Sequence, residues 1–232
     1  MCFEAKRLLK LALGPVLMLM SVVALASGGE VNQVNMSPGA THVGERIYDL
    51  HMVILGICTV IGIGVFGVMF YSIIYHRKSK GHKPSHFHES TKVEIAWTVV
   101  PFLILIGMAV PATSTLLEIY DFEDAEMDIL ITGYQWKWKY EYINENGENV
   151  SFFSNLRTPQ SEIYNSQPKG EHYLLEVDEP VVIPVDTKVR FLVTANDVIH
   201  SWWVPDLAVK KDAIPGFINE AWTRASEEGI FR

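Results

Sequence analysis

The chain has 232 residues, 49% of them hydrophobic, and a mean hydropathy of +0.15. This average is too apolar for an ordinary soluble domain, so segments that cross a membrane are expected. The formal net charge of −8 excludes a nucleic-acid-binding role, because an acidic surface repels phosphates.

The first apolar run has the features of a secretory signal peptide. Three basic residues precede an apolar stretch at 11–25, which ends in the small-residue pattern Ala24-Leu25-Ala26. A basic start, a short apolar core and an A-x-A site are typical of signal peptides. We predict a signal peptide at 1–26 and, after its cleavage, a periplasmic N-terminal segment at 27–48. An uncleaved membrane anchor is the alternative.

Two longer apolar runs predict membrane-spanning helices. The run at 52–75 has 24 residues without a charge. At about 1.5 Å of rise per residue, it is long enough to cross a bilayer core of about 30 Å. The run at 95–117 contains two prolines, which membrane helices tolerate when neighbouring groups satisfy the freed carbonyls. We expect transmembrane helices at 49–76 and 94–117.

The segment that connects the two helices, at 77–93, is basic. Its five cationic residues, against the single acid Glu89, are Arg77, Lys78, Lys80, Lys83 and Lys92. Positively charged loops stay on the cytoplasmic side of a membrane. We therefore predict a multi-pass protein of the bacterial inner (plasma) membrane, with both mature ends and the segment after the second helix in the periplasm.

Residues 118–232 form an acidic segment with strand-like patterning. They carry 21 acidic and 10 basic residues. At 134–142, aromatic residues alternate with Gln, Lys and Glu, as in a strand with one buried face. Further strand-like runs lie at 150–153, 172–177, 181–184, 189–194 and 221–224. The pattern predicts an all-β sandwich of the cupredoxin type.

Six short motifs follow one another along this predicted topology. They are Ile47-Tyr48-Asp49-Leu50-His51, Val93-Glu94-Ile95-Ala96-Trp97-Thr98, Gln135-Trp136-Lys137-Trp138, Leu174-Leu175-Glu176-Val177-Asp178, Asp197-Val198-Ile199-His200-Ser201-Trp202 and Asp212-Ala213-Ile214-Pro215-Gly216. Together they resemble subunit II of cytochrome c oxidase, over most of the chain from Thr41 onward. The resemblance implies a subunit that accepts electrons from cytochrome c at a dinuclear copper centre. It would pass them to haem in subunit I, where oxygen reduction is coupled to proton translocation.

The resemblance makes His200 the candidate copper ligand. In the family this histidine is the first ligand of the dinuclear centre Cu-A, and a later loop supplies two Cys, a Glu carbonyl, a second His and a Met. The chain stops at Arg232, before such a loop, so we expect an incomplete site. A copper pair needs soft thiolates, whereas Cys2 precedes an apolar stretch and Cys58 lies inside a membrane-length run. Haem is expected only in subunit I.

Two further residues take roles from the resemblance. Trp136 would be the surface residue that receives the electron, because an exposed π-system close to the metal shortens the tunnelling gap. The alternative is a core aromatic in a strand at 134–142. Glu94, at the cytoplasmic start of the second helix, would lie at the mouth of a proton-uptake path into subunit I. The alternative for Glu94 is an ordinary interfacial carboxylate.

Three carboxylates, Glu141, Asp178 and Asp197, would by resemblance belong to the surface that docks basic cytochrome c. Taken singly, each is an ordinary surface acid. The expected partners are therefore subunit I, other oxidase subunits, cytochrome c and the membrane, but no nucleic acid.

Two other classes of protein share part of this pattern. A copper-free quinol oxidase subunit II has the same helical hairpin and β-domain, but it has no copper-related reason to keep His200 and Trp136. A truncated structural membrane protein without redox function is the second alternative, and only the expected absence of the later loop supports it.

Overall fold

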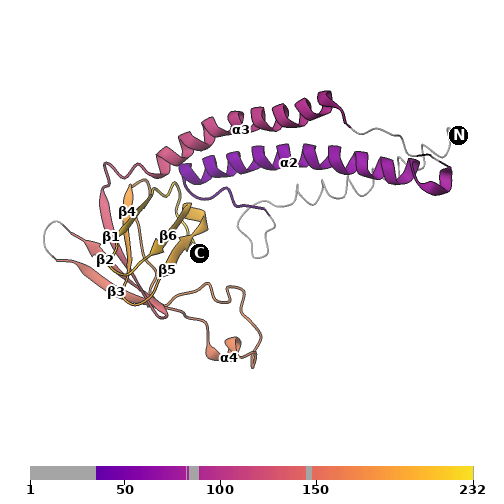
Figure 1. The fold of residues 1–232 in the computed structure, drawn as a ribbon. Coiled ribbons are helices and arrows are strands. Elements are labelled where there is room, and N and C mark those ends of the chain that lie inside the picture. Colours follow the sequence, from indigo (N-terminus) through magenta and orange to yellow (C-terminus); the bar gives the residue numbers. More distant parts are fainter. Residues whose placement is uncertain (1–34, 82, 84–88, 145–147, 232) are drawn as a thin grey trace. The chain divides into compact units, whose positions relative to one another are not determined.

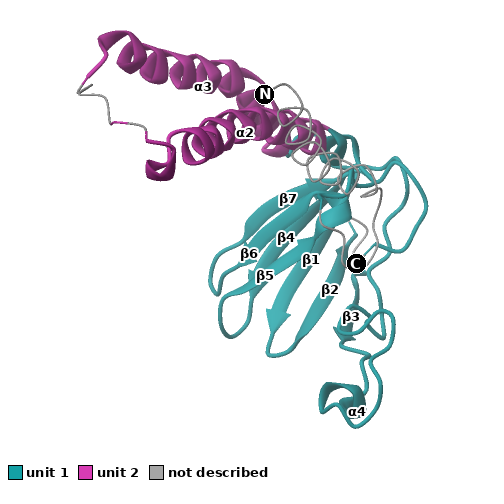
Figure 2. Ribbon diagram, turned by 90° about the vertical axis from the view of Figure 1, so that its right-hand side faces the viewer, with its two compact units in different colours: residues 1–45, 122–232 teal, residues 46–121 magenta. Residues whose placement is uncertain are grey.

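The computed structural model describes residues 35–81, 83, 89–144 and 148–231, so the predicted signal peptide lies outside the described residues. The chain divides into two compact units. One unit combines residues 1–45 with 122–232, and the other comprises 46–121 (Figure 2).

The unit at 46–121 is a helical hairpin (Figure 1). Its helices are α2, His42–Tyr75, and α3, Thr91–Ile119, with the short 3-10 helix η1, Lys78–Lys80, after α2. Both long helices are sufficiently long and apolar to cross a membrane, with mean hydropathies of 2.6 and 2.2 over 18-residue windows. The two predicted membrane helices are present, and both prolines of the second lie inside α3.

Polar contacts mark the ends of this hairpin. The Gly44 N–H donates to Thr41 Oγ1 at 2.9 Å, which satisfies one of the unpaired amides in the first turn of α2. Helix α2 consequently begins seven residues before the predicted boundary, in a polar stretch that hydropathy does not detect. Near the same end, Arg46 contacts Glu118 of α3 at 2.6 Å. This ion pair joins the start of α2 to the end of α3.

The second unit is built on two sheets. Its strands are β1 Met127–Tyr134, β2 Lys137–Ile143, β3 Val150–Asn155, β4 Val189–Ala195, β5 His200–Val204, β6 Val209–Ala213 and β7 Asn219–Thr223. Five strands form a sheet in the order β3-β2-β1-β4-β7, and β5 pairs with β6 in a separate two-stranded sheet. The pair β1 and β4 is parallel, whereas the other pairs are antiparallel. The short helices α4, Gln160–Ile163, and η2, Pro205–Leu207, lie in connections.

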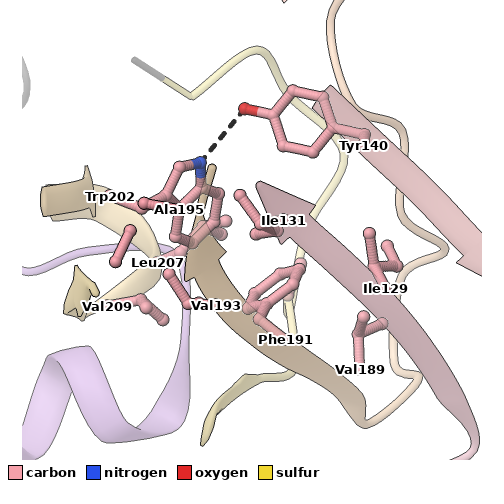
Figure 3. Close-up of a cluster of buried hydrophobic side chains, with 12 residues drawn as sticks. Ile129, Ile131, Tyr140, Val189, Phe191, Val193, Ala195, Trp202, Leu207 and Val209 are labelled. Atoms are coloured by element: carbon pink, nitrogen blue, oxygen red, sulfur yellow. Dashed lines mark hydrogen bonds between the residues drawn. The ribbon is translucent and has the colours of Figure 1, made fainter. Parts of the chain in front are cut away.

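The core lies on one face of the five-stranded sheet (Figure 3). Alternate residues of β1 and β4 are fully buried, as expected of strands with one buried face: Ile129, Ile131, Val189, Phe191 and Val193. Trp202 of β5 packs on Phe191, and its Nε1–H donates to the Tyr140 hydroxyl of β2 at 3.0 Å. The small sheet therefore closes over the large one, and the predicted fold of two helices followed by a β-sandwich is confirmed.

Residues 35–45 are part of this β unit. The Ala40 N–H donates to the Asp206 carbonyl at 2.7 Å, and the Ser226 N–H donates to the Ala40 carbonyl at 2.9 Å. Ala40 and Thr41 are buried. The segment before α2 is thus tied to η2 and to the residues after β7.

Three details of the strand prediction are wrong. The aromatic run at 134–142 is not one strand, because the chain turns at 135–136 between β1 and β2. The runs at 172–177 and 181–184 form no strands, although Val177 makes an isolated bridge with Leu156. The runs at 150–153, 189–194 and 221–224 correspond to β3, β4 and β7.

Candidate functional site

His200 lies at one end of the β-sandwich, where its ring packs against Gly133. It is the first residue of β5 and pairs with Ala213 of β6. A Cβ atom added to Gly133 of β1 would lie 2.7 Å from His200 Cδ2, so the imidazole needs glycine at this strand position. Trp138 of β2 meets the imidazole edge-on, with ring centroids 5.7 Å apart. These contacts fix the plane of the ring and leave its side chain 15% exposed.

Asp197 orients the imidazole from the loop before β5. Its Oδ1 accepts from the Val198 N–H at 2.6 Å and lies 2.7 Å from His200 Nε2. Its Oδ2 accepts from the Gln135 N–H at 2.7 Å. The hydrogen bond with His200, followed by the backbone donors, lowers the pKa of Asp197 to about 2. At neutral pH the carboxylate can only accept, so Nε2 carries the proton and donates it.

The other ring nitrogen of His200 remains a lone-pair donor. In the neutral imidazole with its proton on Nε2, Nδ1 carries a free lone pair, which is the form that binds a metal. Within the described residues, Nδ1 has no hydrogen-bond partner. A histidine whose second nitrogen donates to a carboxylate is the arrangement that proteins use for metal-binding imidazoles.

Trp136 occupies the turn between β1 and β2 and is 87% exposed. Tyr134 and Lys137 form the last pair of the ladder before this turn, and the Gln135–Trp136 peptide bond is cis. The core alternative for Trp136 is therefore wrong. The hydrogen bond from Gln135 to Asp197 joins the turn directly to the loop that carries His200.

Asp178 lies beside the same turn. Its Oδ1 accepts from the Asn155 N–H at 2.7 Å, and its Oδ2 accepts from Asn155 Nδ2 at 2.9 Å. Asn155 in turn pairs with Lys137, the residue after Trp136. The Asn155 backbone and side-chain donors lower the pKa of the Asp178 carboxyl below its ordinary value. Asp178 and Asp197 thus flank the Trp136 turn.

Glu141 lies further along β2, four residues beyond Lys137. At about 3.3 Å per residue, this spacing corresponds to about 13 Å. Its carboxylate accepts from Lys139 Nζ and from Asn149 Nδ2, each at 3.0 Å. Both hydrogen bonds lower the pKa of Glu141, and the bond from Lys139 has the larger effect. The adjacent lysine partly neutralises the negative field that Glu141 presents to a partner.

Glu94 belongs to the helical unit, where it lies in the first turn of α3. Its carbonyl accepts from Thr98 Oγ1 at 2.9 Å. The structure brings together Trp136, Asp178, Asp197 and His200 at one end of the β unit.

A complete copper centre is not present in the part of the chain that the structure describes. No group of three or more His, Cys, Asp or Glu side chains there could hold a metal ion. Cys58 is exposed on α2, and Cys2 lies outside the described residues. His200 has the chemistry of one copper ligand, but the described residues do not fit the full ligand set of a dinuclear centre.

Two contributors to the site had no assigned role in the sequence motifs. Gly133 accommodates the ring of His200, and Trp138 contacts its edge. A glycine inside a strand is a recognised sign of close approach by another group. The strand-like pattern in the sequence begins at Tyr134, so Gly133 was recognisable as a strand glycine only from the structure.

The fold and site define a membrane-anchored β-sandwich protein in which the turn that carries an exposed tryptophan is hydrogen-bonded, through Asp197, to a half-buried histidine. Two family models match the chain. One, described as cytochrome C oxidase subunit II, periplasmic domain, matches residues 127–232. The other, cytochrome C oxidase subunit II, transmembrane domain, matches residues 29–115.

Curated relatives agree with the family models. The chain is 36% identical over 215 residues to the probable cytochrome c oxidase subunit 2 of Rickettsia bellii, covering 93% of this chain and 77% of that one. It is 38% identical to the corresponding protein of Rickettsia prowazekii, with 86% of this chain and 61% of that one covered. The periplasmic domain of subunit II from Bradyrhizobium japonicum is 40% identical, with a TM-score of 0.38, over 47% of this chain and 70% of that chain.

The chain belongs to the cytochrome c oxidase subunit II family. Membership makes it a component of an oxidase complex. Together with the two apolar helices, the periplasmic-domain match identifies a membrane protein with a periplasmic domain.

Proposed function

We propose that this chain receives electrons from cytochrome c and passes them to haem in subunit I of a bacterial oxidase. There, oxygen reduction would be coupled to proton translocation. The observation that carries the proposal is the position of Trp136: the residue is 87% exposed, and its turn is hydrogen-bonded to Asp197, in the loop that leads into His200. An aromatic at the surface of a redox site offers a π-system that a docked donor can approach closely.

His200 would supply one imidazole to the copper centre, through Nδ1. When bound, a copper pair supplies one-electron redox chemistry, and it needs thiolates as well as imidazoles. The described residues place no thiolate beside His200, so by themselves they do not fit a dinuclear copper centre. What this chain contributes is an oriented donor atom: Asp197 holds the proton on Nε2, and Gly133 gives the ring its space.

The docking surface is proposed to be the acidic rim around Trp136. Asp178 and Asp197 lie on either side of the turn, and the segment 118–232 has 21 acids against 10 bases. Such a field would steer a basic cytochrome c and weaken as salt shortens the Debye length. Glu141 would belong to the outer part of this rim.

Docking is tested by stopped-flow association of cytochrome c with the assembled oxidase across a salt titration. The variant Asp178→Asn removes one charge beside Trp136. The matched control Asp186→Asn removes one charge at an exposed left-handed residue close to Val189, at the opposite end of β4, where asparagine is tolerated. We expect slower association and a shallower salt dependence only for Asp178→Asn. Equal effects of the two variants would reject a localised docking surface.

Glu94 is proposed as the proton-uptake entrance, on the cytoplasmic side of a bacterial inner membrane. The placement is supported by its position in the first turn of α3, just after the basic connection at 77–93. Both mature ends would then lie in the periplasm. Reconstituted oxidase with Glu94→Gln should take up protons more slowly than one with Glu89→Gln, which removes a charge from the connection instead. Identical uptake rates would remove Glu94 from the path.

A further inference from the structure

Asp197 makes contacts that a docking carboxylate does not need. Its two oxygens accept from donors on two separate segments. One donor is the Gln135 N–H of the β1–β2 turn; the others are the Val198 N–H of the loop before β5 and the ring of His200 at the start of β5. All three distances are between 2.6 and 2.7 Å. By contrast, Asp178 bonds to Asn155 and to the amide that follows it.

A second contact joins the end of β1 to the same loop before β5, directly after the Gly133–Ala195 pair of β1 with β4. The Asn196 N–H donates to the Gly133 carbonyl at 2.9 Å. The ring of His200 also occupies the space over Gly133 that a Cβ atom would fill. The end of β1 and the turn after it are therefore joined to the loop before β5 and to His200 by backbone, side-chain and packing contacts at one place.

We propose that Asp197 is a positioning residue that fixes the Trp136 turn relative to His200 and keeps the His200 proton on Nε2. We call this set of hydrogen bonds, from Asp197 to Gln135, Val198 and His200, the Asp197 bridge. The proposal deepens the proposed function and rests on it, since it gives Asp197 a role in the electron path in addition to its place in the docking surface. The bridge keeps the exposed indole and the candidate ligand at a constant separation.

The chemistry of the carboxylate explains why aspartate is needed. An ionised carboxylate offers acceptors on both oxygens, and the Asp197 bridge uses both. Asparagine has the same shape but only one oxygen, and its amide would face either the Gln135 N–H or the His200 ring donor. Asp197→Asn can therefore preserve only one half of the bridge, and Asp197→Ala preserves neither.

The first experiment measures amide hydrogen exchange of the full chain in detergent. We expect the Gln135 amide to exchange roughly tenfold faster, or more, in Asp197→Ala, because a hydrogen bond to a charged acceptor is lost. The Phe191 amide, in the buried strand β4, should keep its protection and so report an intact fold. The matched variant Asp178→Ala should release the Asn155 amide and leave Gln135 unchanged. Unchanged exchange at Gln135 in Asp197→Ala would overturn the bridge.

The histidine provides a second readout that a purely structural role would not alter. Nitrogen-15 shifts of His200 should report the Nε2–H tautomer in the unmodified chain and a mixture of tautomers in Asp197→Ala. If Asp197→Ala does not fold, Asp197→Asn is used in its place. We then expect either the loss of exchange protection at the Gln135 amide or the loss of the single His200 tautomer. Retention of both features would overturn the proposal.

The last arm separates positioning from docking in the assembled oxidase. For Asp197→Asn we expect slower reduction of the oxidase at saturating cytochrome c, beyond any change in association. For Asp178→Asn we expect a change in association alone. If Asp197→Asn alters only association, the carboxylate docks the partner and the positioning role is wrong. If neither variant affects the kinetics while the exchange results hold, the bridge is purely structural and the positioning role in the electron path is wrong. Failure of the electron-accepting function itself would show instead as an unchanged rate of reduction in Trp136→Phe.

Discussion

The substitution Gly133→Ala tests the packing of His200 most sharply. The added methyl would lie 2.7 Å from His200 Cδ2 and 2.9 Å from Cγ, distances at which atoms must move. Forcing an extra methyl into a packed site costs about 1–3 kcal/mol. Alanine recovers roughly 0.5–1 kcal/mol relative to glycine within a strand. We therefore expect a net loss of about 1–2 kcal/mol of unfolding free energy.

The assay is thermal unfolding of the full chain in detergent, followed by near-ultraviolet circular dichroism of the β unit. At about 4 °C per kcal/mol for a domain of this size, Tm should fall by roughly 4–8 °C. The control is a double-mutant cycle with His200→Ala, which removes the ring and leaves only Cβ, 3.2 Å from the added methyl. In that background Gly133→Ala should cost almost nothing. An equal cost in both backgrounds would show that the ring does not occupy this space.

Three further predictions concern the β unit. Tyr140→Phe leaves the buried Trp202 N–H without its acceptor and should lower the free energy of unfolding by about 1–3 kcal/mol. The hydroxyl of Tyr142 is exposed, so Tyr142→Phe should lower it less, and equal losses of Tm in the two variants would contradict the buried bond. Because the pKa of Asp178 is lowered in the folded state, its ionised form contributes stability above pH 3.8 that is lost as pH falls through the folded pKa. The Tm deficit of Asp178→Asn should therefore be present at pH 7 and vanish in strong acid, and a pH-independent deficit would refute that linkage. Gly39→Ala places a Cβ 3.0 Å from the Asp206 carbonyl oxygen at a φ of +78°, so it should destabilise the β unit by about 1–2 kcal/mol. Unchanged thermal unfolding would show that the contacts between residues 35–41 and η2 do not stabilise the β unit.

The helices were predictable because lipid selects an apolar composition that the sequence displays directly. The ends of the helices were less predictable. Helix α2 starts at His42, in a polar stretch that is helical because Thr41 Oγ1 accepts a hydrogen bond from the Gly44 N–H of the first turn. Such capping depends on local backbone geometry, which hydropathy averages do not contain.

Strand patterns failed where a turn preserved the alternation. The aromatics at 134–142 keep period two across the turn at 135–136, so the pattern could not reveal that Trp136 points to solvent. The segment 172–177 is rich in apolar residues yet makes only an isolated bridge at Val177. Pairing partners decide whether such a run becomes a strand, and they lie elsewhere in the chain.

The site residues were identified from motifs, but their arrangement was not. His200 and Trp136 belong to separate motifs, and nothing in either one indicates that Asp197 accepts from Gln135, 62 positions away. Only the fold brings these segments together. That contact changes the interpretation of Asp197 from a surface acid to a bridge between two loops.

The central claim is that electrons enter this chain at Trp136. Its direct test is single-turnover reduction of the assembled oxidase by saturating cytochrome c, comparing Trp136→Phe with Trp203→Phe. Trp203 is also exposed, at 60%, but it lies on β5 with Lys210 over its ring. We predict a rate at least about tenfold lower for Trp136→Phe, equivalent to about 1.4 kcal/mol of barrier, and an unchanged rate for Trp203→Phe. Equal rates for Trp136→Phe and the unmodified oxidase would contradict the account.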